Sequence, residues 1–127
     1  MANNRDIQVI SHIKTYCEDV AKSIQCFGDD YKVFASDIDY FNSVSMSIVQ
    51  IGELSSILSD SFREDTNDEL QWNLIRGMRN MYAHEYQKMD KSIIWETATK
   101  DIPNLLRFCE KVIENGVPDA NTTETAE

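Results

Sequence analysis

The sequence is poor in the residues that turns and membrane segments require. Its 127 residues include only four glycines and two prolines, and so little turn chemistry disfavours a β-sandwich or a β-barrel. No apolar run approaches the roughly 20 residues of a membrane span. The N-terminus also lacks the charged and then apolar pattern of a signal peptide. We therefore expect one globular domain that makes no contact with a membrane.

Cysteine and histidine are scarce as well, with three and two copies. Cys17, Cys26 and Cys109 show no CxxC spacing, and each lies in a helical apolar pattern. They are therefore predicted to be reduced, mostly buried thiols of a cytoplasmic protein. Because a zinc site takes four ligands, these scattered residues favour neither a metal nor a cofactor.

Basic residues are in deficit: 12 Lys and Arg stand against 22 Asp and Glu, for a net charge of −10. Because nucleic-acid affinity comes mainly from Lys and Arg on phosphates, this balance at first argues against a nucleic-acid partner. The charges are unevenly spread, however. Residues 76–91 hold four basic and two acidic residues, a local charge of +2 that favours a phosphate site. The basic ones are Arg76, Arg79, Lys88 and Lys91.

Apolar residues recur every three or four positions almost throughout, which predicts helices and no strand. We expect an all-α, up-and-down four-helix bundle. Residues 1–115 should form its single domain, and residues 116–127 a flexible acidic tail without large apolar residues. The four stripes of apolar residues lie at about 7–27, 41–62, 70–81 and 93–113.

Local signals suggest where these helices start and stop. Ser36 with Asp39 resembles a capping box for the second helix, and Asn67 or Asp68 can cap the third, which should loosen near residues 83–86. Pro103 lies inside the fourth helix and removes one backbone donor, so a kink is expected near residues 99–102. Residues 31–35 then form a short bridge and residues 63–68 a loop.

The second helix is unusual because Glu53 is its one charged residue between positions 41 and 59. Such a helix is predicted to be buried on more than one side, or to face a partner subunit as well. An isolated carboxylate there needs a partner. Glu53 is therefore interpreted as one side of a structural hydrogen bond or ion pair, for which a motif Arg is a candidate, with a role in the site as the alternative.

Other candidate residues have simpler interpretations. His12 has polar neighbours and is predicted to lie on the surface. Trp72, Trp95 and the methionines at helical spacing are predicted to belong to the core. Arg76 could either line a cleft or be a solvated charge.

The informative segment combines Arg79, His84 and Tyr86. Histidine can take up and release a proton near pH 7, and arginine can hold a phosphate with two hydrogen bonds. Together they could cleave RNA without a metal: His84 would take the proton from a ribose 2′-OH, and Arg79 would stabilise charge on the pentacoordinate phosphorus.

Helix geometry restricts this interpretation. Five positions along an α-helix turn about 500°, so Arg79 and His84 point roughly 140° apart. They cannot share one face of a regular helix. Either the helix ends before His84, or these residues converge with groups from another chain across a two-fold axis.

The run Gly77-Met78-Arg79-Asn80, followed by His84-Glu85-Tyr86, resembles the HEPN motif (Arg, four residues, His) in the extended form that ends His-x-Tyr. That form is typical of HepT-like toxins. The resemblance covers about residues 5–114, although the Pro that relatives often carry just before Trp72 is missing. Similar flanking features are Ile51-Gly52-Glu53, Trp72, Asp90 with Ile94-Trp95, and Asp101-Ile102-Pro103.

This resemblance implies a specific function. HepT-like proteins are HEPN ribonucleases that act as toxins in toxin–antitoxin pairs, and they form homodimers whose active site lies where the two motifs meet. Arg79 and His84 would be the catalytic pair, with Asn80 helping to orient the site. The substrate would be RNA and not DNA. The cognate antitoxin, MntA, is a minimal nucleotidyltransferase that transfers AMP from ATP to the motif Tyr, here Tyr86. The added charge and bulk would repel and block an RNA phosphate.

Two other interpretations stay open. HEPN domains without catalysis exist, so the chain could be a non-catalytic binding module that serves as the helical partner of a nucleotidyltransferase. It could also be a purely structural helical dimer. In that case Arg79 and His84 would cap helix carbonyls and complement the helix dipole, and Tyr86 would be an ordinary half-buried tyrosine.

Overall fold

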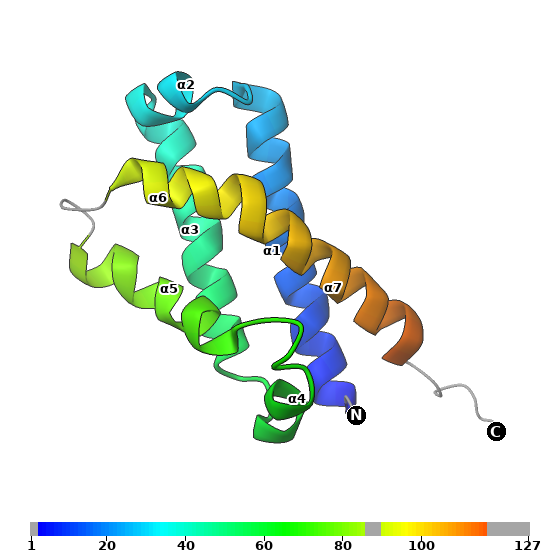
Figure 1. Ribbon diagram of the computed structural model, residues 1–127. Coiled ribbons are helices and arrows are strands. Elements are labelled where there is room, and N and C mark those ends of the chain that lie inside the picture. The colour runs from blue at the N-terminus through cyan, green and yellow to red at the C-terminus, as the bar shows by residue number, and fades with distance from the viewer. Residues whose placement is uncertain (1–2, 86–89, 117–127) are drawn as a thin grey trace.

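The described part of the chain is helical and contains no strand, which confirms the predicted all-α class (Figure 1). The computed structural model describes the backbone of residues 3–85 and 90–116 and the side chains of residues 3–79 and 90–115. The predicted tail beyond residue 116 lies outside these ranges. The elements are α1 (Asn4–Phe27), α2 (Tyr31–Ser36), α3 (Ile38–Ser55), α4 (Asp60–Asp65), α5 (Trp72–Glu85), α6 (Lys91–Glu96), a π-helical turn (Thr97–Asp101) and α7 (Ile102–Gly116).

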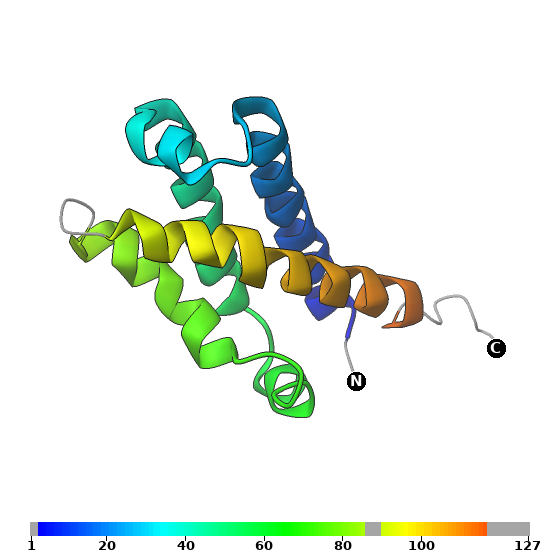
Figure 2. The ribbon, with the colours of Figure 1, turned by 45° about the horizontal axis from the view of Figure 1, so that its top comes forward.

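Helix α3 is the central helix of the bundle. It packs against α1 and against α5, and α7 packs against α1. Figures 1 and 2 both show that α6, the π turn and α7 form one continuous helical segment, which crosses α1 and α3. Neighbours on several sides explain why α3 is so poor in charge, as the sequence predicted. Among the helices that the structure describes, none is both long and apolar enough to cross a bilayer.

Aromatic groups pack at two places in the core. Between α2 and α6, the ring centroids of Phe34 and Trp95 are 5.1 Å apart. Between α5 and α7, those of Trp72 and Phe108 are 5.8 Å apart. The two tryptophans thus belong to the core or pack against it, as expected. Met78, a methionine at helical spacing in the third stripe, also packs against the core, as expected.

Asp6 is buried although it is ionisable, and it joins two elements that are distant in sequence. Its carboxylate accepts hydrogen bonds from the Ser59 amide at 2.9 Å and the Ser59 hydroxyl at 2.7 Å. The same hydroxyl accepts from the Phe62 amide and caps α4. The start of α1 and the start of α4 are therefore held together.

The predicted capping box of the second helix is wrong. Helix α3 begins at Ile38, and its N-cap is Asp37, whose side chain accepts hydrogen bonds from two amides of the first turn. Ser36 instead ends α2, where its hydroxyl bonds back to its own helix. Asp37 follows α2 directly and caps α3. Because no loop separates the two helices, the apolar pattern does not mark the boundary between them.

Two short helices replace predicted irregular segments. The expected bridge at 31–35 is helix α2, and the expected loop at 63–68 begins with the end of α4. Each has six residues and its own N-cap, Asp30 and Ser59. A six-residue helix is too short to show a periodic stripe. Because α5 begins only at Trp72, the predicted caps Asn67 and Asp68 do not lie at its start.

The predicted distortion before Pro103 is present as the π turn. Proline has no N–H to donate and crowds the preceding helical turn. Here the Ile102 amide donates to the carbonyl of Thr97, five residues back. The turn overlaps the predicted stretch of residues 99–102 and separates α6 from α7.

The cysteines are free thiols, as predicted. Cys17 of α1 and Cys109 of α7 are buried, whereas Cys26 is exposed. A hydrogen bond with Cys109, together with burial, raises the pKa of Cys17. Cys17 therefore stays protonated at neutral pH and acts as a small packing residue.

Candidate active site on helix α5

Arg79 lies where α5 crosses the C-terminal end of α3. Its Nη1 donates a hydrogen bond of 2.8 Å to the Ser56 hydroxyl oxygen and is 3.9 Å from a carboxylate oxygen of Glu53. The ion pair predicted for Glu53 is therefore confirmed. The Arg79 side chain is 38% exposed and that of Glu53 is 58% exposed. The guanidinium is therefore bound to α3 through Nη1 and is also partly accessible to solvent.

Gly52 allows this close contact between the two helices. A Cβ atom at position 52 would lie 2.8 Å from the Arg79 amide nitrogen and 3.1 Å from the Ile75 carbonyl oxygen. Both are backbone atoms that cannot move without shifting α5. Only glycine lets the backbone of α5 approach α3 this closely, and that approach places Arg79 beside Ser56.

Within the part of the chain whose side chains are described, Arg79 keeps guanidinium donors that no other residue uses. Both contacts that the described residues make with its guanidinium use Nη1. A guanidinium has five N–H donors in a planar fork that fits two oxygens of one phosphate. The arrangement therefore suits a permanently charged phosphate-binding group that is fixed at one end.

Arg76, one turn before Arg79, is half-buried. Its Nε is buried and finds no hydrogen-bond partner among the described residues. Arg76 is therefore partly exposed, and both interpretations from sequence, a cleft residue and a solvated charge, stay predictions. Lys91, which the sequence counted in the same cationic patch, lies elsewhere: its Nζ donates to the Ala35 carbonyl at 2.9 Å and lies 5.0 Å from the Phe41 ring centroid.

The backbone of α5 continues through His84 to Glu85. The loosening predicted from residue 83 is therefore absent up to Glu85, and the helix does not end before His84. Positions 79 and 84 stay about 140° apart round one helix axis. Of the two ways in which Arg79 and His84 could act together, an end of the helix before His84 is excluded, and convergence with groups from another chain stays a prediction. The side chains of Asn80 and His84, and all of Tyr86 and Lys88, lie outside the described residues.

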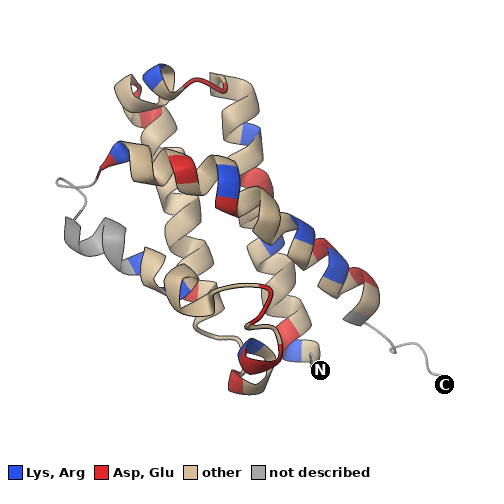
Figure 3. Ribbon diagram, in the orientation of Figure 1, with Lys and Arg blue, Asp and Glu red and all other residues tan. Residues whose placement is uncertain are grey.

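Charged residues of the described segments lie on several elements. Figure 3 shows them along α1, along α6 and α7, and on α4 near the C-terminal end of α3, whereas most of α3 is uncharged. His12 is exposed on α1, as predicted. Within the described residues, no group of three or more His, Cys, Asp or Glu side chains could hold a metal ion.

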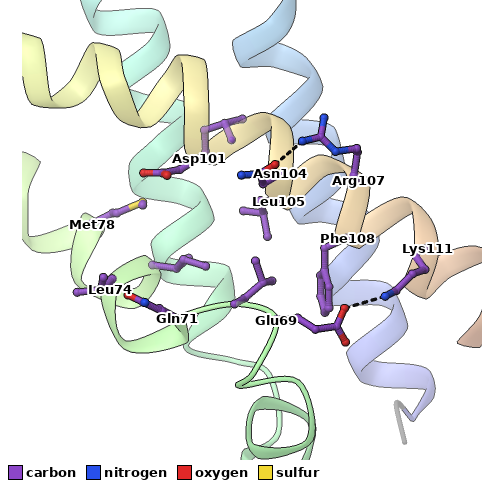
Figure 4. A pocket seen from close by; sticks show the side chains of 13 residues that line it. Glu69, Gln71, Leu74, Met78, Asp101, Asn104, Leu105, Arg107, Phe108 and Lys111 are labelled. Carbon is purple, nitrogen blue, oxygen red and sulfur yellow. Dashed lines mark hydrogen bonds and ion pairs between the residues drawn. The ribbon is translucent and has the colours of Figure 1, made fainter.

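A separate groove of about 570 Å³ lies between α5 and α7 (Figure 4). Leu74 and Met78 of α5 face Leu105 and Phe108 of α7 across it, and Leu74 is 65% exposed. Neither Arg76 nor Arg79 lines this groove. Neither the groove nor Ser56 was predicted from the sequence. Ser56 follows Glu53 by three positions, however, and this spacing places the two side chains on one face of the helix.

Comparisons with known proteins agree on one family. The family model described as "Ribonuclease HepT-like" matches residues 13–112. A protein named "Putative RNase" from Caldanaerobacter subterraneus is 30% identical over 83% of this chain and 91% of its own length. Another of that name, from Methanocaldococcus jannaschii, is 26% identical over 79% of this chain and 95% of its own length. No solved structure matches the chain significantly.

Proposed function

The chain belongs to the HepT-like ribonuclease family, and from this premise we propose that it is a metal-independent endoribonuclease toxin with its active site at a homodimer cleft. The observation that carries the proposal is the family match across residues 13–112, which includes the segment of Arg79 and His84. The free thiols of the described residues support a reducing, cytoplasmic location.

The proposed reaction is attack of a ribose 2′-oxygen on the adjacent phosphorus. His84 takes the 2′-OH proton, the bond from phosphorus to the 5′-oxygen breaks, and that oxygen leaves as a hydroxyl with a proton taken from water. The products are a 2′,3′-cyclic phosphate end and a 5′-OH end. Arg79 binds the non-bridging oxygens and stabilises the charge that develops on them. Asn80, next to the arginine, helps to orient the phosphate.

Purified protein should therefore cleave RNA in the presence of EDTA and leave 2′,3′-cyclic phosphate ends. Expression of the protein alone should arrest growth. A non-catalytic binding module, the alternative function, would bind its nucleotidyltransferase partner and do neither. Absence of cleavage together with normal growth would favour that alternative and contradict the toxin assignment.

Several features of α5 support the homodimer. Arg79 faces α3, whereas position 84 lies on the outer side of the helix, about 20° from Gly77. The described residues of this outer face are uncharged: Asn73 and Leu74 are exposed, and a Cβ at Gly77 would meet nothing within 4 Å. Interface cores are depleted of charge, whereas an RNA surface needs basic residues. We infer that a second copy covers this face.

Gly77 provides a test of the dimer. In the monomer, Gly77→Ala should raise the free energy of unfolding by about 0.5–1 kcal/mol, because alanine favours the helix and its Cβ has open space. The same methyl group should weaken the dimer. Urea unfolding at monomeric concentrations and sedimentation velocity measure the two effects. If the variant dimerises as tightly as the wild type, the outer face of α5 is not the interface.

We further propose that the cognate antitoxin is an MntA-like nucleotidyltransferase that adenylylates Tyr86. The phenolic oxygen attacks the α-phosphorus of ATP, pyrophosphate leaves, and the phenolic proton goes to solvent. The added AMP places negative charge near the guanidinium that binds RNA.

Co-expression with the antitoxin should raise the mass of the protein by whole AMP units and abolish cleavage. The Tyr86→Phe variant should gain no AMP and should stay toxic beside the antitoxin. Tyr82→Phe, a change at a tyrosine four positions earlier, is the matched control and should still be modified. Intact-protein mass spectrometry reads both variants, and a Tyr86→Phe protein that still carries AMP would contradict the assignment.

A further inference from the structure

Ser56 holds the Arg79 guanidinium in its working position, and we propose that it is a positioning residue of the ribonuclease site. This inference rests on the proposed function. Ser56 Oγ accepts the 2.8 Å hydrogen bond from Arg79 Nη1. The same oxygen lies 3.3 Å from the Gly52 carbonyl, to which its hydroxyl hydrogen donates. With that hydrogen directed at Gly52, a lone pair of the oxygen faces Arg79.

The turn that carries Ser56 is itself fixed. Ser56 is the C-cap of α3, and its amide donates to the Glu53 carbonyl at 3.2 Å. Arg63 reaches back from α4 and donates to the carbonyls of Ser55, at 3.1 Å, and Leu58. A guanidinium at this end also complements the helix dipole. Arg79 is therefore bound to an acceptor that cannot easily move with it.

Glu53 plays a different part. It is 3.9 Å from Arg79 Nη1, outside hydrogen-bonding distance, and more than half exposed. An exposed ion pair at such a distance does not hold the guanidinium in one fixed position. The carboxylate does repel an approaching phosphate. Ser56 therefore sets the position of Arg79, whereas Glu53 weakens the attraction of the site for RNA.

The two roles predict different kinetic changes for two residues on adjoining turns. Ser56→Ala removes the acceptor and should lower kcat about 10-fold, equivalent to about 1.4 kcal/mol, with KM within about twofold of wild type. Ser56→Thr keeps the hydroxyl and should restore kcat. Glu53→Gln should instead lower KM, and the difference should shrink at high salt because the effect is electrostatic.

Ser55→Ala is the matched control. Ser55 is the adjacent serine, and its hydroxyl donates to the Ile51 carbonyl at 2.8 Å, as that of Ser56 does to the Gly52 carbonyl. Among the described residues, the serine hydroxyl that Arg79 bonds is that of Ser56. Removal of the Ser55 hydroxyl should leave kcat unchanged. Thermal unfolding of each variant distinguishes a loss of fold from a loss of positioning. A slow Ser56→Ala variant together with a Ser56→Thr variant at wild-type kcat shows that the hydroxyl itself is required.

The outcomes separate this inference from the proposed function. If wild-type protein cleaves no RNA, the proposed function is wrong. If the wild type cleaves and folded Ser56→Ala cleaves with the same kcat, or if Ser56→Thr is as slow as Ser56→Ala, the positioning role is wrong while the ribonuclease assignment stands.

Discussion

Cleavage of RNA by a His84→Ala variant should fall about 10²- to 10⁴-fold below that of the wild type, the range for removal of a general acid–base. A 2′-OH is a very weak acid, so its oxygen attacks phosphorus slowly unless a base takes the proton as the bond forms. Arg79 can bind and polarise the phosphate, but a guanidinium stays protonated and cannot take that proton. The loss should therefore lie in kcat, with RNA binding largely retained, as single-turnover cleavage in EDTA would show.

The sequence offers a matched control, because it contains one other histidine. His12 is exposed on α1, outside the region where α5 crosses α3. His12→Ala should cleave RNA like the wild type. Equal cleavage by folded His84→Ala would show that another group is the base, and it would leave only the binding role of Arg79 in the proposed mechanism.

The second large effect is expected at Gly52. A Gly52→Ala side chain would meet the Arg79 amide nitrogen at 2.8 Å and the Ile75 carbonyl oxygen at 3.1 Å. The two helices must then separate, which should destabilise the fold by about 1–3 kcal/mol, as overpacking does. A displacement of about 1 Å at the reacting centre can cost about 10²-fold in rate. We therefore expect this methyl group to reduce kcat by about that factor even in the molecules that fold.

Gly77→Ala is the matched control for stability, because it adds the same methyl group to the other helix where no atom lies within 4 Å. The two substitutions should change the free energy of unfolding in opposite directions. Chemical unfolding of both variants at monomeric concentrations measures the two changes without a contribution from dimerisation. A Gly52→Ala protein as stable as the wild type would mean that α5 can move away from α3 without cost, and Arg79 would then not depend on this contact.

The long helices could be predicted because each buries a stripe that recurs over many turns. The stripe of Ile10, Ile13 and Cys17 in α1 is buried as the pattern required. Helices α2 and α4 were missed, because six residues with one local cap do not establish a period. Their formation depends on tertiary contacts such as the one between Asp6 and Ser59, whose partners are 53 positions apart.

The sequence predicts a chemistry for the candidate site, which stays a prediction, but it does not predict the contacts that support Arg79. Arg79 and His84 are recognisable from their spacing, since they belong to one short segment. The contact between Arg79 and Ser56 spans 23 positions and depends on how closely α3 and α5 pack, which Gly52 decides. The sequence shows that a glycine lies within a predicted helix, but it does not show which other helix packs against the glycine.

The π turn determines how the segment between α6 and α7 should respond to the deletion of a residue. Ile94 and Ala98 are buried before or within it, and Leu105 and Cys109 are buried after it. Each residue of a helix advances the chain by about 100° round its axis. The π turn holds one residue more than an α turn, so deleting one residue between positions 97 and 101 should close it to a regular α turn and keep these pairs on the buried side. The π turn should therefore tolerate a single-residue deletion better than α6 or α7, where the loss of one residue rotates the rest of the helix by about 100°.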